Sequence, residues 1–147
     1  MAQFVREFKE EDYQDVLHIW NKTDMGGEHR GYNLDVIEDT INFGGRIFIL
    51  EDDDHGIIGT SWITNDQRRL YLHHFGILPE FQGKGYSHFL MEKCMEFAMD
   101  EGLQIKLEVG KSNHTAKNLY KKYGFKYLGD YDVLIVRNPE DINLNDL

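Results

Sequence analysis

The chain has 147 residues, 41% of them hydrophobic, and a formal net charge of −10. This length fits one domain that buries most of a core, and no apolar run approaches the ~20 residues of a membrane span. Because a nucleic-acid-binding surface must be basic, the acidic balance argues against nucleic acid as a partner and favours a cationic one.

A single cysteine, Cys94, cannot form an internal disulfide, which agrees with a reducing compartment. We interpret Cys94 as a helix core residue, because nothing in the sequence supplies it with a base. The first residues carry charge too early and too often for a signal peptide. We therefore expect a cytoplasmic protein without a membrane segment.

The first half of the chain predicts a strand, two helices and an antiparallel meander. Residues 3–8 have the pattern of an edge strand, and apolar residues recur at helical spacing from Tyr13 to Trp20. Glycines among polar residues predict a loop over 22–34, followed by a short helix over 34–42. Three strands joined by turns rich in Asp, Asn and Gly are then expected at residues 46–51, 57–65 and 70–78.

The second half predicts two helices that alternate with strands. The long helix over 85–101 ends at Gly102. It places five residues on one apolar face, namely Phe89, Leu90, Cys94, Phe97 and Ala98. A strand over 104–109 precedes a helix that Asn113 or Ser112 caps and that Gly124 ends.

Two last strands, over 126–129 and 133–137, are expected to close the sheet. We expect the domain to span residues 1–137 and the acidic, polar tail over 138–147 to be frayed. The order of elements predicts an α/β (α+β) fold, with one mixed, mostly antiparallel sheet and helices on both faces.

The most informative segment joins the third strand of the meander to the long helix. It reads Gln82-Gly83-Lys84-Gly85-Tyr86-Ser87. Glycines at such a turn leave backbone N–H groups unobstructed, and the helix N-terminus adds partial positive charge, so the turn can bind a pyrophosphate. It lacks the glycine spacing of a Walker loop and of a dinucleotide fingerprint. A plain glycine turn and an NTPase loop stay as alternatives.

The pattern Gln/Arg-x-x-Gly-x-Gly/Ala after Ile77-Leu78-Pro79 resembles the acyl-CoA loop of the GNAT N-acetyltransferase superfamily. Ser87 stands where Gly or Ala is usual, and we expect this small residue to be tolerated, with its hydroxyl donating a hydrogen bond to phosphate. A second segment is similar to the later half of the same superfamily, with Leu107-Glu108-Val109, Ser112-Asn113, Leu119-Tyr120 and Gly124-Phe125. It is closest to the branch of ribosomal-protein alanine N-acetyltransferases, although Gly110 replaces the Arg often found there. The resemblance covers 3–137 in outline and is specific over 75–125.

This resemblance implies a GNAT-like fold and an acetyl-CoA-dependent N-acetyltransferase in which Glu108 acts as base and Tyr120 as acid. It implies that acetyl-CoA, the cosubstrate, runs beside a strand and ends on the glycine loop. The residues expected to bind it are Phe75, Gly76, Ile77, Gln82, Gly83, Lys84, Gly85, Tyr86, Ser87 and Asn113. A bulged or splayed strand at Gly76 would open the slot for it.

The acceptor is expected to meet the loop over 22–34 through Asp24, Glu28 and Tyr32, with a plain solvated loop as the alternative. His73 and His74 are neighbours on a strand, so we expect them to point to opposite faces and to form no metal site. One of the two is a candidate auxiliary base.

We predict acetyl transfer to a primary amine by direct attack in a ternary complex. A small molecule, a protein or a peptide can carry this amine. No residue is placed for a covalent acetyl-enzyme. The alternative from another class is a non-catalytic module that binds or senses acyl-CoA. A homodimer is compatible with the sequence.

Overall fold

One five-stranded sheet organises the chain in this computed structural model, which describes residues 2–23, 25 and 31–146. The strands lie in chain order across the sheet: β1 (Gln3–Glu7), β2 (Arg46–Asp52), β3 (Gly56–Asn65), β4 (Arg69–Ile77) and β5 (Gln104–Leu107). Neighbouring strands are antiparallel except β4 and β5, which are parallel. The predicted mixed, mostly antiparallel sheet is confirmed.

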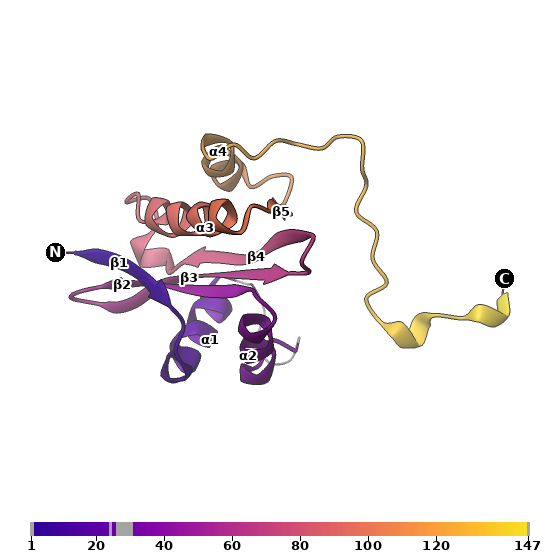
Figure 1. Cartoon of the computed structure of the whole chain (residues 1–147), viewed down its shortest axis with the longest axis horizontal. Helices are drawn as coiled ribbons and strands as arrows, with labels where there is room; N and C mark the ends of the chain where they lie inside the picture. Colours follow the sequence, from indigo (N-terminus) through magenta and orange to yellow (C-terminus); the bar gives the residue numbers. More distant parts are fainter. Residues whose placement is uncertain (1, 24, 26–30, 147) are drawn as a thin grey trace.

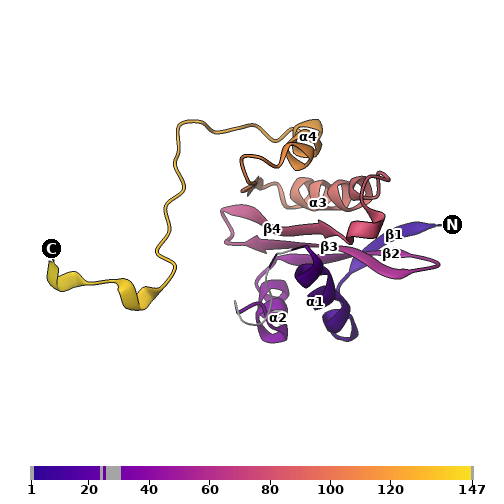
Figure 2. The same cartoon turned by 180° about the vertical axis from the view of Figure 1, so that it is seen from behind.

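The helices cover both faces of this sheet, as the element order predicted. Helices α1 (Tyr13–Lys22) and α2 (Leu34–Asn42) lie on one face, and α3 (Ser87–Glu101) and α4 (His114–Lys122) lie on the other (Figures 1 and 2). Short 3-10 helices occur at Glu10–Asp12, Pro79–Phe81, Pro139–Asp141 and Leu144–Asp146. No helix in the described ranges is long and apolar enough to cross a membrane.

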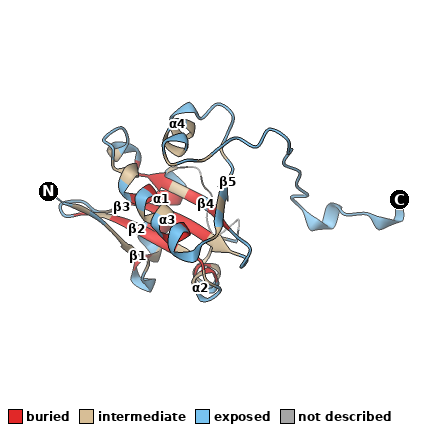
Figure 3. Ribbon diagram, turned by 45° about the horizontal axis from the view of Figure 1, so that its top comes forward, coloured by how far each residue is buried: buried red, intermediate tan, exposed pale blue. Residues whose placement is uncertain are grey.

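The hydrophobic core is divided by the sheet into two clusters. Figure 3 shows buried residues, in red, on the central strands and on the helices that cover them. On the α3 side, the buried residues of the helix are Leu90, Met91, Cys94, Phe97 and Ala98. Phe89 was expected on this face, but its side chain is 42% exposed. The helical repeat of 3.6 residues aligns Met91 with Cys94 and Ala98 and turns Phe89 to the flank.

Helix α3 begins at Ser87, two residues later than predicted, because Gly85 has a φ of +81° that no right-handed helix accepts. The helix ends at Gly102 in the left-handed conformation, as expected. Strand β5 ends at Leu107 rather than at residue 109.

The expected closing strands over 126–129 and 133–137 are wrong for this structure. Residues 126–138 contain no strand, and the segment runs away from the sheet (Figure 1). Its apolar and β-branched composition suits a strand, but a strand also needs a neighbour to pair with, and none lies beside it among the described residues. The domain boundary at residue 137 stays a prediction.

Candidate active site

Strands β4 and β5 part before β4 ends. Their pairing covers Arg69–Leu72 and Gln104–Leu107. Beyond it, Phe75, Gly76 and Ile77 pair with β3 on one side and with no described strand on the other. The predicted cofactor strand therefore has a free main-chain edge, along which an extended ligand can add like another strand.

A β-bulge lies where β4 begins to leave β5. Trp62 pairs with His74 and Ile63 pairs with Leu72, so His73 is the extra residue. Both histidine rings consequently contact Trp62, with centroids 5.8 Å and 5.1 Å away. The expectation that His73 and His74 point to opposite faces is wrong, because the bulge breaks the alternation on which it depended. No group of three His, Cys, Asp or Glu side chains that could hold a metal occurs in the described part of the chain.

Gly76 is explained by close approach rather than by the bulge. A Cβ atom at this position would collide with the Cε atom of Met25 and lie 3.4 Å from Thr23 Oγ1. Met25 also accepts a hydrogen bond from His74 Nε2 through its carbonyl at 3.0 Å. Thr23 and Met25, which follow α1, thus lie over the face of β4 at Gly76.

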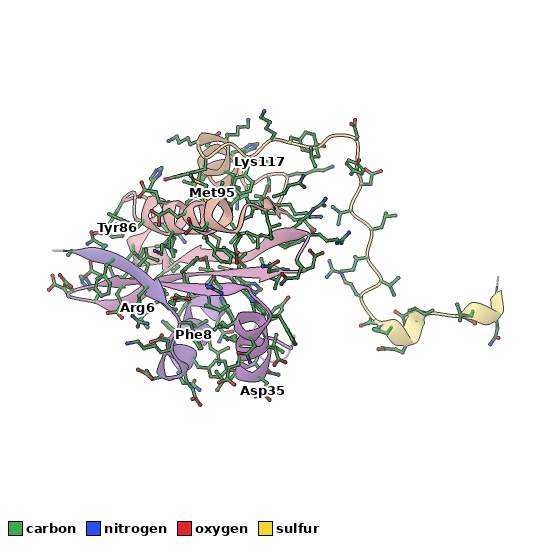
Figure 4. All side chains as sticks on the ribbon, viewed as in Figure 1. Arg6, Phe8, Asp35, Tyr86, Met95 and Lys117 are labelled. Carbon is green, nitrogen blue, oxygen red and sulfur yellow. The ribbon has the colours of Figure 1, made fainter. Side chains whose placement is uncertain are left out.

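The glycine loop has an open backbone at the start of α3. Gly83 and Gly85 have φ of +77° and +81°, with empty space where a Cβ would stand. Within the described ranges, no acceptor is bound by the backbone N–H groups of residues 83–87. These amides and the helix N-terminus suit a pyrophosphate. Figure 4 shows Tyr86 at this end of α3.

Two side chains of the glycine loop, those of Gln82 and Lys84, contact neighbouring residues of the same chain. The Gln82 amide donates to the Ile77 carbonyl at 2.8 Å, which braces the loop against the end of β4. The Lys84 ammonium lies 5.9 Å from the centre of the Phe81 ring. Beyond the loop, His88 Nδ1 lies 2.9 Å from Tyr123 Oη, so the start of α3 is tied to α4.

Glu108 directly follows β5 and is exposed. Its carboxylate accepts a hydrogen bond from the hydroxyl of Tyr71 on β4. Burial, and then the hydrogen bond to Glu108, raise the pKa of Tyr71, so this hydroxyl stays a donor. The sequence did not predict a role for Tyr71. The one sequence feature that points to it is the alternation of β4, which places Tyr71 on the face opposite to the buried Leu70 and Leu72.

His73 stacks on Tyr71 with ring centroids 4.1 Å apart, and its Nε2 lies 2.6 Å from Thr64 Oγ1. Burial and the neighbouring His74 lower the pKa of His73 to about 4, so its ring is neutral at pH 7. A hollow of about 240 Å³ opens beside this group. It is lined by Thr64, Asp66, Arg68, Arg69, Tyr71 and Lys106.

Tyr120 lies on α4 and packs on the α3 side of the sheet, with Phe75 at 6.2 Å and Phe125 at 5.7 Å between ring centroids. Burial raises the pKa of Tyr120 to about 12. Its hydroxyl makes no hydrogen bond to any residue that the structure describes. The structure records no contact between Glu108 and Tyr120, since the partners of the two side chains lie on opposite faces of the sheet.

Asn113 caps α4, because its Oδ1 accepts from Ala116 N at 3.2 Å. The predicted cap is confirmed, and its contact with the cofactor stays a prediction. Tyr32 packs edge-on against His74 and Trp62, with centroids at 4.6 Å and 5.3 Å. Asp24 and Glu28 lie outside the described residues.

Residues 8–125 match the model of the acetyltransferase (GNAT) family. AAC(6')-Iy, solved in complex with the bisubstrate analog CoA-S-monomethyl-acetylneamine, is 15% identical over 94% of this chain and 99% of that chain, with a TM-score of 0.75. An N-acetyltransferase from Staphylococcus aureus Mu50 is 19% identical over 88% of this chain and 86% of its own, with a TM-score of 0.75.

The ribosomal-protein-S18-alanine N-acetyltransferase from Escherichia coli is 18% identical over 85% of this chain and 78% of that chain, with a TM-score of 0.66. These likenesses to solved structures establish the fold, and the match over residues 8–125 establishes the family. The chain belongs to the acetyltransferase (GNAT) family and is an N-acetyltransferase with acetyl-CoA as its cosubstrate.

Proposed function

We propose that this enzyme transfers the acetyl group to a primary amine by direct attack in a ternary complex. The observation that carries the proposal is the free edge of β4 beyond Leu72, with Tyr120 packed on one side of the sheet and Glu108 held on the other. This arrangement gives a thioester lying along β4 a base from one side and an acid from the other. No nucleophile is needed from the protein.

The proposed reaction begins when Glu108 takes a proton from the amine, directly or through water. A lysine amine has a pKa of about 10.4 and needs such a base at neutral pH. The amine nitrogen attacks the thioester carbonyl carbon, and a backbone N–H of β4 stabilises the oxyanion that forms. The carbonyl then re-forms as the C–S bond breaks, and the departing thiolate takes the hydroxyl proton of Tyr120. The extra proton on the newly bonded nitrogen passes to solvent, from which Tyr120 is reprotonated.

For the cosubstrate, we propose that the pantetheine arm pairs with Phe75, Gly76 and Ile77 and that Asn113 contacts it from α4. The pyrophosphate would bind the amides of residues 83–87, with Ser87 donating from its hydroxyl. The support is the unpaired edge and the open loop amides described above. Gln82 would act through the loop that it braces, and Lys84 and Tyr86 would flank the phosphates.

For the acceptor, we propose the face that carries Tyr71 and Glu108, which adjoins the hollow beside Tyr71. Asp24, Glu28 and Tyr32 would complete the site, because Met25 and Tyr32 pack against the same strand at His74. A ribosomal-protein N-terminus is one acceptor to test, on the strength of the Leu107–Phe125 pattern. We also propose the cytoplasm as its compartment, which suits the single cysteine.

The decisive variant is Tyr120→Phe. We expect kcat to fall by about 10²-fold or more, because general acid catalysis contributes that much and the variant removes only a hydroxyl that has no protein partner. The change in kcat is measured as the rate at which free CoA is released from acetyl-CoA in the presence of a panel of amines. Tyr123→Phe, directly after the same helix, is the control: it removes a hydroxyl that contacts His88 and has no part in the proposed reaction, so its kcat should stay within a few fold.

The alternative, a non-catalytic module that binds acyl-CoA, predicts CoA binding by calorimetry without CoA release for any amine in the panel. Equal turnover by wild type and Tyr120→Phe would refute the acid role while leaving the family intact.

Glu108→Gln keeps the hydrogen bond from Tyr71 but cannot take a proton. We therefore expect it to lower kcat/KM most for lysine-like amines.

A further inference from the structure

The hollow beside Tyr71 has a basic lining in an acidic protein. Its charged residues are three basic ones, Arg68, Arg69 and Lys106, and one acidic one, Asp66. The chain as a whole has a net charge of −10, so the hollow is locally opposite in sign to the molecule. A hollow lined by one sign of charge concentrates ligands of the other sign. The lining therefore favours an anionic group.

Two of the three basic side chains are available to a ligand. Arg68 pairs with Asp66 at 2.9 Å, and Asp66 also accepts from the backbone N–H groups of residues 68 and 69. Arg69 and Lys106 are exposed and make no ion pair within the part of the chain that the structure describes. A guanidinium and an ammonium both donate charge-assisted hydrogen bonds to carboxylate or phosphate oxygens.

The hollow and the proposed base lie along the same pair of strands. Lys106 pairs with Tyr71 across β5 and β4, and its ammonium lies 5.2 Å from the centre of the Tyr71 ring. The hydroxyl of that ring donates to Glu108, two residues after Lys106. Two residues of extended chain span about 7 Å. A ligand with its amine at Glu108 can therefore reach Lys106 with a group about 7 Å away from that amine.

The hollow is separate from the proposed site of the CoA phosphates. Figure 1 shows the hairpin between β3 and β4 at the end of the sheet away from the start of α3. Arg69, which lines the hollow, begins β4, and Ile77, which leads toward the glycine loop, ends it. The nine residues of this strand span roughly 26 Å. With the pyrophosphate at the glycine loop, the hollow is left to the acceptor.

We propose that the hollow binds an anionic group of the acceptor, a carboxylate or a phosphate that lies about 7 Å from the acetylated amine. Arg69 and Lys106 bind this group while Glu108 receives the amine. The proposal rests on the proposed function and narrows its acceptors to amines that also carry a negative charge. Such a zwitterion also suits the negative charge of the whole molecule, which attracts its ammonium. An α-amino acid is too short, because its carboxylate is bonded to the carbon that carries the amine.

The first test compares 6-aminohexanoate with its uncharged amide as acceptors, by the rate of CoA release. We expect kcat/KM for the acid to be higher by about tenfold or more, since hydrogen bonds between charged groups contribute on this scale. Arg69→Gln should reduce this ratio about tenfold through a higher KM for the acid, with little change in kcat, because the hollow does not touch the reacting atoms. Equal losses for acid and amide would overturn the proposal.

Arg137→Gln is the matched control for this test. It is the same substitution at an exposed position outside the hollow, so the ratio of acid to amide should stay unchanged. Lys106→Glu should reverse the preference, so that 1,6-diaminohexane becomes a better acceptor than 6-aminohexanoate. A merely structural role of Lys106 would lower the activity with both acceptors and produce no reversal.

The second test asks whether the anion belongs to a peptide or to a small molecule. The peptide amides Ala-Glu-Ala and Ala-Gln-Ala differ only in the charge of the second side chain. A preference for the acid within the peptide pair alone identifies a peptide acceptor, and one within the 6-aminohexanoate pair alone identifies a small molecule. No preference in either pair overturns the proposal.

A binding measurement separates this proposal from the proposed chemistry. In NMR titrations of the isotope-labelled protein without acetyl-CoA, 6-aminohexanoate should shift the backbone amides of Arg69 and Lys106 more than its uncharged amide does. These shifts without CoA release for any amine would refute acetyl transfer and keep the anion site. CoA release without the shifts and without a preference for acids would refute the anion site and keep the transfer. Absence of both would refute both.

Discussion

The hydroxyls of Tyr71 on β4 and Tyr120 on α4 differ in what they contact. Tyr71 donates to Glu108, whereas the Tyr120 hydroxyl bonds to none of the residues that the structure describes. The motif around Glu108 and Tyr120 predicted both candidates from the sequence. Tyr71 could not be predicted in the same way, because its contact with Glu108 joins residues 37 positions apart.

Tyr71→Phe should lower kcat/KM by about tenfold, because a hydrogen bond to a charged group is worth about 1.5–3 kcal/mol and positions the base. Steady-state kinetics with a responsive amine measures the change. In a double-mutant cycle with Glu108→Gln, the free-energy loss calculated from kcat/KM of the double variant should be smaller than the sum of the two single losses, since both act through one carboxylate. Full additivity would mean that Tyr71 acts elsewhere.

His73 gives a second prediction at the residue scale. A histidine has a pKa near 6.5 when free, and burial lowers the pKa of His73 to about 4. The neutral ring is therefore favoured by folding, and the stability linked to it is complete above about pH 6.5 and declines as the pH falls toward 4. NMR titration of the histidine rings, assigned with His73→Gln, should show this midpoint well below 6. A midpoint near 6.5 would contradict the neutral ring at pH values just below 6.

At the scale of elements, local signals predicted the helices and the meander with small shifts in their ends. The Asn113 cap, the glycine stops at Gly102 and Gly124 and the α2 boundaries agree with the sequence, because caps and periodicity act over a few residues. The bulge at His73 left no such signal. It depends on the register between β3 and β4, which is set by packing on both faces of the sheet.

The glycine loop allows a matched pair of substitutions. Gly85 and Gly56 have φ of +81° and +75°, and both have open space where a Cβ would stand. Each change to alanine should cost about 1–2 kcal/mol of unfolding free energy, because the left-handed conformation disfavours a Cβ. Only Gly85→Ala should also weaken CoA binding in calorimetry, since Gly56 begins β3 and lies outside the glycine loop. Equal CoA affinity in both variants would remove the loop from the binding site.

At the scale of the whole molecule, buried carboxylates tie the first strand to the sheet. Arg6 on β1 pairs with Asp12 at 2.8 Å and with Glu51 on β2 at 2.5 Å. Asp52, also on β2, accepts from Gln3 Nε2 at 2.8 Å and from the backbone of the turn that follows. The hydrogen bond from Gln3 and then that from His55 lower the pKa of Asp52 to about 2.

This network predicts how stability depends on acid. The pKa of Asp52 is about 2 in the fold and about 3.9 in an unfolded chain, so its contribution is complete above about pH 5 and is lost as the pH falls from about 4 to 2. The melting temperature should fall over this range. Asp52→Asn should have a lower melting temperature at pH 6, and its melting temperature should fall less as the pH is lowered toward 2. Asp53→Asn, at an exposed neighbouring position, should follow the wild type. The same fall of melting temperature with pH in all three proteins would refute the assignment.

The sequence by itself determined the helices, the meander, the glycine loop and the family, because periodicity, caps and short motifs are written in neighbouring residues. The tertiary structure decided where β4 leaves β5, which tyrosine holds Glu108, and that the Val133–Val136 segment does not pair within its own sheet. These features depend on contacts between residues far apart in the chain. A strand-forming segment becomes a strand only when its backbone pairs with that of a neighbouring strand.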